Sequence, residues 1–558
     1  MRKRLIPIYS VLVVAIVLLA ILVPSCGGGR TFGLTMAVSP LGSGTAVDLT
    51  GGSPYTSGAV VSIQATPLGS YQFVQWTAPA GTFANATAAA TTFTMPAQNV
   101  TVTAHFVGPL DHFKSYNVAD ASPIGRNVSL KDQFVNIQAT VRQAMLFANP
   151  TTKVHMPPAM DISNPDHHLT FYWLNHTEYG RQWNVEVKNQ FGTQLLTVGG
   201  PVALAVPTQK LVPGNHTQPV GLDHFLVYAV VNQVTVGVPV GLKDEFGDDP
   251  EVAVGEAIFF ANPVEKTVPG AAITPIMHPD EHLVFYKVTG STAQPPTMVQ
   301  AVNQFNAQAQ NLYLSSPASL LGVPSEKLEW GEQLDHFTVY QVTQEPTPAL
   351  EEVRLKDQFI DITVNVTWPY YFCNPASKMF LTDVFPPIMH PDYHFTWYAI
   401  EPEGQQSWSV QVQNQFGSQL LQVTGPSYLL VPAQKQVPGD HGLPVGLDHF
   451  LLYAVQPGPY EPTGVWVKDQ FSSPTGESVT VGPPLWFGVP VEKTHDTNVI
   501  QIKNPLTHLV FYGIGGAVVS YPKVQAADQF HTQNLTLGLP VYMLGVPSLK
   551  LEFHPLPP

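Results

Sequence analysis

The chain has 558 residues, a formal net charge of −15 and 12% charged side chains, about half the usual fraction of ~25%. Its hydrophobic content of 44% is enough for packed cores and argues against a disordered chain. No Lys/Arg cluster follows the N-terminus, which argues against nucleic acid as a partner. The two cysteines, Cys26 and Cys373, cannot form a disulfide framework, so we expect Cys373 to be a small buried residue.

The N-terminus has the pattern of an export signal. Met1-Arg2-Lys3-Arg4 is positively charged and precedes an apolar run over residues 5–23. The ending Val23-Pro24-Ser25-Cys26 resembles a bacterial lipobox, which implies that Cys26 becomes the lipidated first residue, although Pro24 is an uncommon choice there. One alternative is an uncleaved membrane anchor, because 19 apolar residues can also span a bilayer. The other alternative is simple secretion. We therefore expect residues 1–26 to direct export or anchoring, residues 27–31 to be a tether, and the rest to lie outside the cytoplasm.

Residues 32–108 form a first small region of alternating apolar and polar residues, which is typical of half-buried strands. Its phrases include Tyr71-x-Phe73-x-x-Trp76, Met95-Pro96 and Ala104-x-Phe106. They resemble the bacterial repeat module related to the internalin-B B-repeats. That resemblance implies a small β module used as a spacer or surface element in exported proteins. We expect Trp76 to be a core residue rather than a ligand-stacking one.

Three phrases recur eight times between residues 110 and 550: His-x-x-x-Tyr, then Asp/Asn-Gln-Phe (Asp-Glu-Phe in copy 3), then Pro-x-x-Lys. Fixed periods of 54 to 59 residues indicate stacked or tandem structural units. We number the copies 1 to 8 in chain order. Their histidines are His112, His168, His224, His282, His336, His394, His449 and His508.

The copies alternate, so the true unit is a pair of about 112 residues. Odd copies carry Leu-Asp-His-Phe and mostly close on Asn-Pro-x-x-Lys, whereas even copies mostly close on Val-Pro-x-x-Lys. Each copy has about four short alternating runs, which predict four strands. The expected fold is all-β, with four tandem sandwich-like or barrel-like modules after the small module; an eight-bladed propeller is the alternative. The expected modules span residues 109–221, 222–333, 334–446 and 447–552, followed by a tail over 553–558.

The repeat also resembles an uncharacterised family of bacterial extracytoplasmic domains of unknown function. The shared phrases are Leu-Asp-His-Phe, Asp-Gln-Phe, Asn-Pro-x-x-Lys and Val-Pro-Ser-x-Lys, and the likeness spans about 440 residues. The family pattern has Cys before the Tyr of the first phrase, whereas this chain has Ser, Val, Leu, Phe or Trp there. The resemblance therefore implies a fold unit in which apolar packing replaces any disulfide, and it implies no activity.

The residues that could carry chemistry are few. A metal site needs converging ligands, whereas each copy has one repeated His, so we expect all eight to be structural. His278-Pro-Asp-x-His282 and His390-Pro-Asp-x-His394 are denser and could capture a transition metal weakly, but the proline makes their geometry uncertain. The acidic run over residues 244–251 could offer Ca²⁺ ligands, although a solvated turn is the preferred interpretation.

No catalytic motif is present, so we expect no enzyme, no metal and no cofactor. The expected function is an exported, envelope-anchored β-repeat protein that presents a binding or adhesive surface, with a glycan or protein ligand. The alternatives are a carbohydrate-binding or carbohydrate-active envelope protein and a purely structural stalk. An exposed row of Trp and Tyr would favour glycan binding, and converging carboxylates would favour an enzyme.

Overall fold

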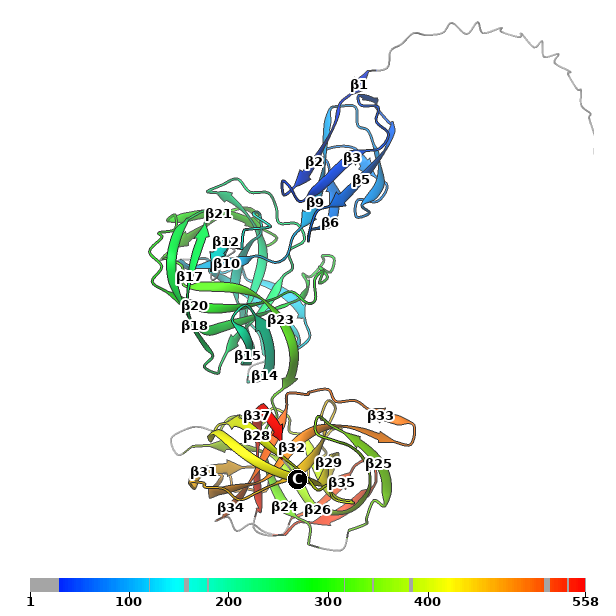
Figure 1. Ribbon diagram of the computed structural model, residues 1–558, viewed down its shortest axis with the longest axis vertical. Coiled ribbons are helices and arrows are strands. Elements are labelled where there is room, and N and C mark those ends of the chain that lie inside the picture. The colour runs from blue at the N-terminus through cyan, green and yellow to red at the C-terminus, as the bar shows by residue number, and fades with distance from the viewer. Residues whose placement is uncertain are drawn as a thin grey trace, which may run out of the picture. The chain divides into compact units, whose positions relative to one another are not determined.

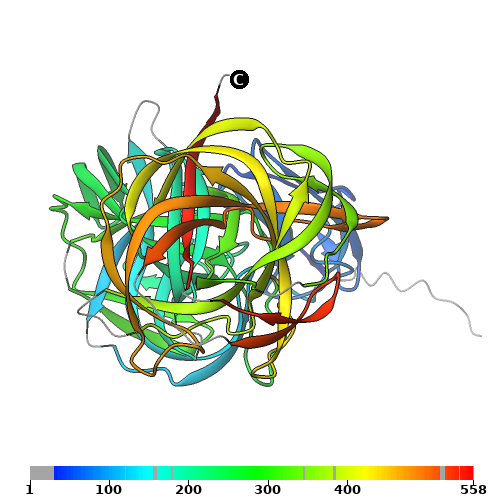
Figure 2. The ribbon, with the colours of Figure 1, turned by 90° about the horizontal axis from the view of Figure 1, so that it is seen from below.

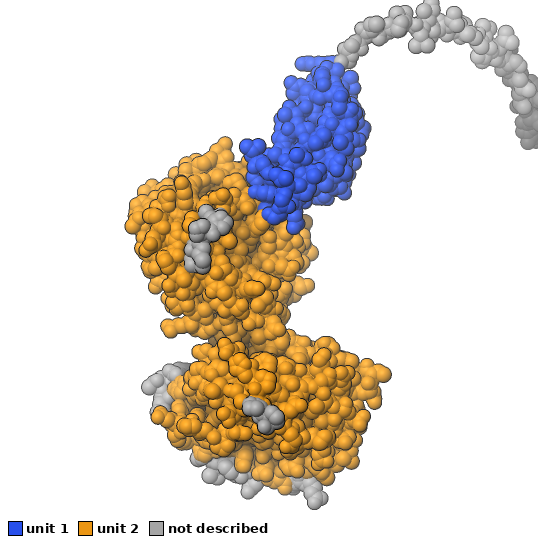
Figure 3. All heavy atoms as spheres, in the orientation of Figure 1, with its two compact units in different colours: residues 1–108 blue, residues 109–558 orange. Residues whose placement is uncertain are grey.

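The computed structural model describes residues 30–119, 121–154, 160–177, 180–315, 317–343, 346–380, 385–515, 522–538 and 541–556. All of its named elements are β-strands (Figure 1). The chain divides into two compact units, residues 1–108 and 109–558, which are coloured separately in Figure 3. Within the described ranges, no helix has the length and apolar character needed to cross a membrane. The export or anchoring role expected for residues 1–26, including lipidation of Cys26, concerns residues outside those that the structure describes.

The first unit is a small β module built on two larger sheets, with β1 and β4 paired as a third, two-stranded sheet. One sheet has the strand order β2-β9-β6 and the other β3-β5-β8-β7. Alternate residues of β5 are buried and face Trp76, whose indole N–H donates to the Ala88 carbonyl oxygen at 3.1 Å. Trp76 is therefore a core residue, as expected. The strands are β1 (Thr31–Phe32), β2 (Leu34–Ser39), β3 (Gly44–Asp48), β4 (Tyr55–Thr56), β5 (Val60–Pro67), β6 (Gln72–Thr77), β7 (Thr82–Phe83), β8 (Ala90–Thr94) and β9 (Val100–Val107).

In the second unit, copies 1 to 4 form a closed ring. Among the described residues, the strand order β10-β12-β13-β15-β16-β18-β20-β23 returns to β10, and every neighbouring pair is antiparallel. This is the first ring. Its wall strands are β10 (His112–Ala119), β12 (Asn136–Val154), β13 (His168–Asn175), β15 (Gly192–Val212), β16 (Phe225–Val230), β18 (Gly247–Pro263), β20 (His282–Thr289) and β23 (Leu320–Glu332).

Copies 5 to 8 repeat the arrangement as the second ring. Its order, β24-β26-β27-β29-β30-β32-β34-β37, also returns to its first strand through the β24–β37 pairing. Figure 2 shows the second ring along its axis, with the ring's strands surrounding the line of sight. The wall strands are β24 (His336–Gln341), β26 (Asp361–Met379), β27 (His394–Glu401), β29 (Gly417–Val437), β30 (His449–Val455), β32 (Glu477–His495), β34 (His508–Gly515) and β37 (Met543–Pro555).

Between its two wall strands each copy forms a hairpin that pairs with the copy two positions away. We call these the crossing hairpins. In the first ring β11 pairs with β19, β17 with β12, β14 with β23, and β21 with β15; β22 completes the fourth hairpin. The second ring repeats this with β25, β28, β31, β35 and β36. The bounds are β11 (Arg126–Lys131), β14 (Trp183–Asn189), β17 (Thr235–Asp244), β19 (Glu265–Thr267), β21 (Met298–Asn303), β22 (Asn306–Leu314), β25 (Glu351–Lys356), β28 (Gln406–Asn414), β31 (Thr463–Lys468), β33 (Asn498–Ile500), β35 (Lys523–Ala527) and β36 (Thr532–Thr536).

The long second strand of most copies carries an interruption where it passes from the hairpin into the wall. The pairing register shifts around Pro201 in β15, Pro369 in β26 and Pro484 in β32. Proline has no N–H to donate to the ladder, so it is tolerated at a bulge and not within regular pairing. The bulge bends the strand, and one strand therefore serves both the crossing hairpin and the ring wall.

Each ring has two cores, one on either side of its wall. The inner core of the first ring draws residues from all eight wall strands and none from a crossing hairpin. Phe171 of β13 and Phe285 of β20 meet there at 5.2 Å between ring centroids. The outer core contains the other face of the wall together with the crossing hairpins. The second ring has the same two layers. Burial on both faces explains why the wall strands are apolar on both faces.

The fold is all-β, as predicted, but the copies assemble four at a time. Neither four tandem sandwich-like modules nor one eight-bladed propeller describes it, because the crossing hairpins link copies 1 with 3 and 2 with 4. The boundaries expected at residues 221/222 and 446/447 therefore fall inside closed rings. Pairs of copies were the correct sequence period, but adjacent copies alone do not complete a core.

Candidate functional site

The first and second repeated phrases meet between opposite copies of a ring. The Tyr of one copy is hydrogen-bonded to the Asp or Asn of the copy two positions away, at 2.7 to 2.9 Å. In sequence these partners lie 96 to 131 residues apart. The pairs are Tyr116–Asp244, Tyr228–Asp132, Tyr172–Asn303, Tyr286–Asn189, Tyr340–Asp469, Tyr453–Asp357, Tyr398–Asp528 and Tyr512–Asn414.

These contacts explain the alternation of the copies. In the first ring's odd copies the buried Asp also accepts from the Asn of an Asn-Pro phrase, as Asp244 does from Asn149 at 3.1 Å. In its even copies the Asn instead donates to a hydroxyl, as Asn189 does to Ser325 at 3.0 Å. Because the first ring pairs odd copies with odd and even with even, its acceptors and donors change together.

One odd copy lacks its donor. Copy 7 has Val489 where the other odd copies have Asn, so the facing Asp357 accepts from Tyr453 and from the backbone N–H groups of Phe359 and Ile360. Burial raises the pKa of the Asp357 carboxyl to about 6. The protonated form of this carboxyl is therefore favoured by folding.

The third phrase links adjacent copies around each ring. In copies 1 to 7 the repeated Lys lies over the Phe of the next copy's second phrase, with Nζ-to-centroid distances of 4.8 to 6.0 Å, whereas Lys550 of copy 8 lies over Phe553. Lys327 of copy 4 lies over Phe134 of copy 1, which closes the first ring. The pairs are Lys153–Phe191, Lys210–Phe246, Lys266–Phe305, Lys327–Phe134, Lys378–Phe416, Lys435–Phe471 and Lys493–Phe530.

The repeated histidines lie in the wall beside these contacts. Several are hydrogen-bonded through Nε2 to the Gln of the next copy's second phrase, as in His112–Gln190 at 2.8 Å and His508–Gln358 at 3.1 Å. Burial lowers the pKa of the imidazole in all eight copies, to about 3 in His112 and His508. These side chains are therefore neutral at physiological pH, and their surroundings are those of wall residues.

One end of the second ring carries a part-exposed aromatic cluster. Tyr371, Tyr428 and Trp486 occupy equivalent positions, three residues before the Asn or Val of the third phrase, and cover the inner core. Tyr370 and Tyr542 lie over them and are 45% and 46% exposed. We call these five residues the aromatic end. In the first ring the same three-residue offset is occupied by Leu146, Ala203, Phe259 and Leu320.

The rings of the aromatic end touch one another across strand boundaries. Centroid separations are 6.1 Å for Tyr370–Tyr428, 5.8 Å for Tyr371–Tyr542 and 4.9 Å for Tyr428–Trp486. The cluster draws on copies 5, 6, 7 and 8, so only the closed ring assembles it. The sequence offered one signal, the adjacent aromatics Tyr370-Tyr371, which sequence reasoning did not single out.

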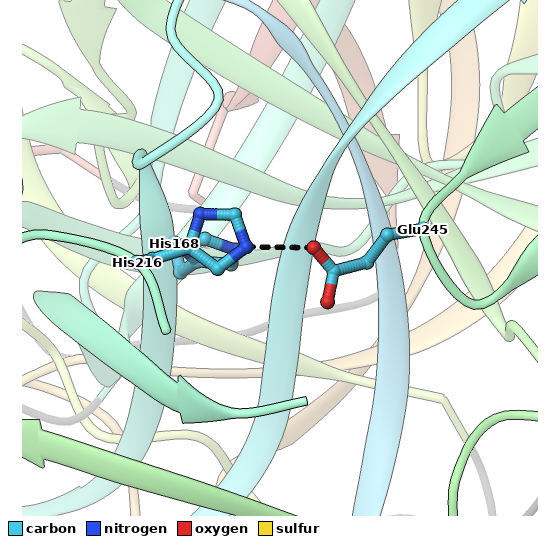
Figure 4. Close-up of side chains that lie close together, drawn as sticks. All are labelled: His168, His216 and Glu245. Atoms are coloured by element: carbon cyan, nitrogen blue, oxygen red, sulfur yellow. Dashed lines mark hydrogen bonds and ion pairs between the residues drawn. The ribbon is translucent and has the colours of Figure 1, made fainter. Parts of the chain in front are cut away.

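A second distinctive cluster lies in the first ring (Figure 4). His168, His216 and Glu245 each present a possible metal-ligating atom, and these atoms all lie within 4.8 Å of one another. His216 Nε2 is 2.7 Å from Glu245 Oε2, and its Nδ1 is 2.9 Å from Asp166 Oδ1. The hydrogen bonds that the His216 ring donates to the carboxylates of Asp166 and Glu245 raise the pKa of His216 to about 9. Of the three, sequence reasoning missed His216 and placed Glu245 in a solvated turn.

The other candidate metal ligands do not converge. His278 Nδ1 lies 3.5 Å from Asp223 Oδ2, while His282 Nδ1 contacts the Asp280 carbonyl oxygen. His390 pairs with Asp335 and Glu332. Within the described residues, His168, His216 and Glu245 are the only such group of three.

The acidic run over residues 244–251 is not a solvated turn throughout. Asp244 and Asp249 are buried, and Asp249 pairs with the buried Lys114 at 2.7 Å. Cys373 is buried in the inner core of the second ring, and burial raises the pKa of its thiol.

Comparison with known proteins identifies both parts of the chain. No curated protein and no solved structure matches it. Residues 34–108 match the Divergent InlB B-repeat domain, which is typical of extracellular bacterial surface proteins. Residues 79–182, 177–308, 289–406 and 394–546 match the Repeat of unknown function (DUF7450). The matched segments cover most of the chain, and the protein belongs to this repeat family.

Proposed function

We propose that this protein is displayed on the bacterial surface and binds carbohydrate at the aromatic end of its second ring. The observation that carries the proposal is the cluster of Tyr370, Tyr371, Tyr428, Trp486 and Tyr542, which four copies contribute to one part-exposed patch. Tyr and Trp present rigid apolar faces with polar edges, which suit the C–H faces and hydroxyls of sugar rings. The proposed role is binding, without catalysis.

The comparison between rings supports this choice of surface. The repeated phrases recur in both rings with few departures, and most of their residues form internal contacts, so the aromatic end is the surface on which the rings differ most plainly. At the aromatic end the second ring has Tyr or Trp at three of four equivalent positions, whereas the first ring has aliphatic residues at three of four. Exposed aromatic patches of this kind are typical of binding sites.

The test is glycan binding by the full chain, followed by titration of the best ligand. Tyr370→Ala and Tyr542→Ala remove two exposed rings, and we expect each to weaken binding at least several-fold without loss of folding. Tyr313→Ala is the matched control, because Tyr313 is 50% exposed on the first ring. Binding that is equally sensitive to all three variants, or no glycan binding at all, would reject the proposal.

We further propose that Cys26 anchors the protein to the membrane as a lipidated N-terminal residue. The support is the lipobox-like Val23-Pro24-Ser25-Cys26 after an apolar run, together with a following module typical of surface proteins. Cys26→Ser should release the protein from the membrane fraction or leave the N-terminal segment uncleaved. Incorporation of a labelled fatty acid that persists in Cys26→Ser would contradict the proposal.

A further inference from the structure

The position that faces the repeated histidine differs in one copy. The second phrase has Gln at this position in seven copies, namely Gln133, Gln190, Gln304, Gln358, Gln415, Gln470 and Gln529. Copy 3 has Glu245 instead. Glu245 faces His168 of copy 2, so a carboxylate replaces an amide beside a buried imidazole.

A second imidazole, that of His216, packs against His168. His216 belongs to the loop that follows β15, and its ring centroid is 4.6 Å from that of His168. The side chains of His216 and Glu245 are 16% and 31% exposed, so an ion could enter from solvent. His168 itself is fully buried.

One aspartate orients both imidazoles. The His168 Nδ1 lies 3.1 Å from the Asp166 carbonyl oxygen, and the His216 Nδ1 lies 2.9 Å from Asp166 Oδ1. Thr217 Oγ1 donates to the other carboxylate oxygen at 2.6 Å and holds it in place. Histidine ligands of metals usually donate their second N–H to a carbonyl or carboxylate in this way, which turns the other nitrogen toward the ion.

The remaining nitrogen of His168 has no use within the protein. His168 Nε2 is buried and, among the described residues, has no hydrogen-bond partner. A buried imidazole acceptor without a partner is unfavourable, and a metal ion would satisfy it. In copies 1, 3, 5 and 8 the Gln of the next copy is hydrogen-bonded to the corresponding nitrogen, whereas the carboxylate of Glu245 has no N–H to donate. Among the described residues, His282 and His394 also have an unpartnered Nε2, but a Gln and not a carboxylate occupies the facing position of the second phrase there.

We propose that His168, His216 and Glu245 bind one Zn²⁺ ion, with water in the fourth position. Two imidazole nitrogens and one carboxylate oxygen form a ligand set typical of zinc, and they favour Zn²⁺ over Ca²⁺ and Mg²⁺. Zinc bonds of about 2.0–2.2 Å bring ligand atoms to about 3.3 Å from one another. The three atoms are already within 4.8 Å, so side-chain rotation suffices.

The competing account is an ion-pair network alone. Lys210 Nζ contacts Glu245 Oε1, so Lys210, Glu245, His216 and Asp166 form a chain of alternating charges. The contact leaves Oε2 directed at His216 Nε2, where an ion would replace the proton between these two atoms. Only the zinc site predicts a stoichiometric metal, and that difference can be measured.

The second ring provides a natural control. His394 and His441 have the same arrangement, with centroids 4.9 Å apart and His441 Nδ1 3.1 Å from Asp392 Oδ1. The residue that corresponds to Glu245 there is Gln470. A neutral amide is a much weaker zinc ligand than a carboxylate, so the second ring should not bind the ion.

The experiment is zinc titration of the full chain in mild detergent, by calorimetry, with Ca²⁺ and Mg²⁺ as comparison ions. We expect one Zn²⁺ per chain and no binding of the other two at the same concentration. His216→Ala and Glu245→Gln should each weaken zinc binding at least tenfold, because loss of even an orienting residue usually costs 10- to 100-fold. Glu245→Gln recreates the residue of seven other copies, so the fold should tolerate it. His441→Ala is the control and should leave binding unchanged.

A gain of function makes the test sharper. Gln470→Glu supplies the missing carboxylate to the second ring and should raise the stoichiometry from one to two. Thermal unfolding with and without zinc reports folding and binding together, since an ion that binds the native state raises Tm. Absence of stoichiometric zinc, or zinc binding that survives both Glu245→Gln and His216→Ala, would overturn the proposal. A change in metal-free stability without any zinc effect would assign the cluster to the ion-pair network alone.

Discussion

Asp469 offers the most direct test of the contacts between opposite copies. Its carboxylate oxygen Oδ2 accepts from Tyr340 Oη at 2.7 Å, Thr338 Oγ1 at 2.6 Å and Asn374 Nδ2 at 3.1 Å. Asp469→Ala leaves Tyr340 and Asn374 without this acceptor, while Thr338 retains the Asn374 carbonyl oxygen at 3.2 Å. Each buried donor left unpaired costs about 1–3 kcal/mol. We therefore expect a loss of about 4 kcal/mol, within the 3–5 kcal/mol typical of a broken buried charge network.

The assay is calorimetry of the full chain, with the second-ring transition identified by hydrogen exchange of peptides from β24. For a ring of about this size, 1 kcal/mol corresponds to about 2–4 °C, so Tm of that transition should fall by roughly 8–16 °C. Tyr340→Phe alone should cost about 1.5–3 kcal/mol, yet be nearly neutral in an Asp469→Ala background. Asp440→Ala, at an exposed position, should change stability by less than about 0.5 kcal/mol. Additive effects of Asp469→Ala and Tyr340→Phe would refute the reasoning.

Three further predictions concern the second ring. Burial raises the pKa of Asp357 from 3.8 to about 6, so this carboxyl stabilises the fold fully below pH 3.8 and loses that stabilisation, about 3 kcal/mol, as pH rises through 6. Unfolding of the wild-type protein and of Asp357→Asn between pH 4 and 7 should show this difference. Parallel stability profiles of the two proteins would contradict it. Gly545→Ala places a Cβ 2.7 Å from Phe511 Cε1 and should cost about 1–3 kcal/mol, whereas Gly464→Ala, with no heavy atom within 4 Å, should be nearly neutral in urea unfolding. Cys373, buried with a raised thiol pKa, should resist alkylation in the native protein and react after unfolding, as peptide mass spectrometry can measure; equal rates would mean that it is accessible.

Sequence patterns were enough to predict the all-β class, the eight copies and their alternation. Those features are local, since strand alternation and short phrases recur at a fixed period. Ring closure was not predictable in the same way. It depends on contacts such as Tyr116–Asp244, in which the partners are 128 residues apart and nothing near either residue indicates the other. The alternation of the copies is real, but it arises because opposite copies of a ring form contacts with each other. It does not mean that two neighbouring copies form a module.

The two candidate sites were harder to predict for different reasons. Exposure of Tyr370 depends on the bulge at Pro369, which changes the face to which the following residues point. The zinc cluster joins a wall residue, a loop residue and a hairpin-tip residue from two copies. Glu245 was visible as the single departure from Gln, but only the fold shows that this position faces His168. The repeated phrases form the scaffold, and both candidate sites lie where the copies differ.

We infer that four copies, and not two, form the folding unit. The direct measurement is urea unfolding of two fragments, residues 334–558 and residues 334–446, followed by circular dichroism and hydrogen exchange. The longer fragment contains a complete second ring and should unfold cooperatively with protected wall strands. The shorter fragment lacks copies 7 and 8, so Tyr340 has no Asp469, the crossing hairpins have no partners, and we expect no cooperative transition. Cooperative unfolding of residues 334–446 with native-like protection would contradict the account.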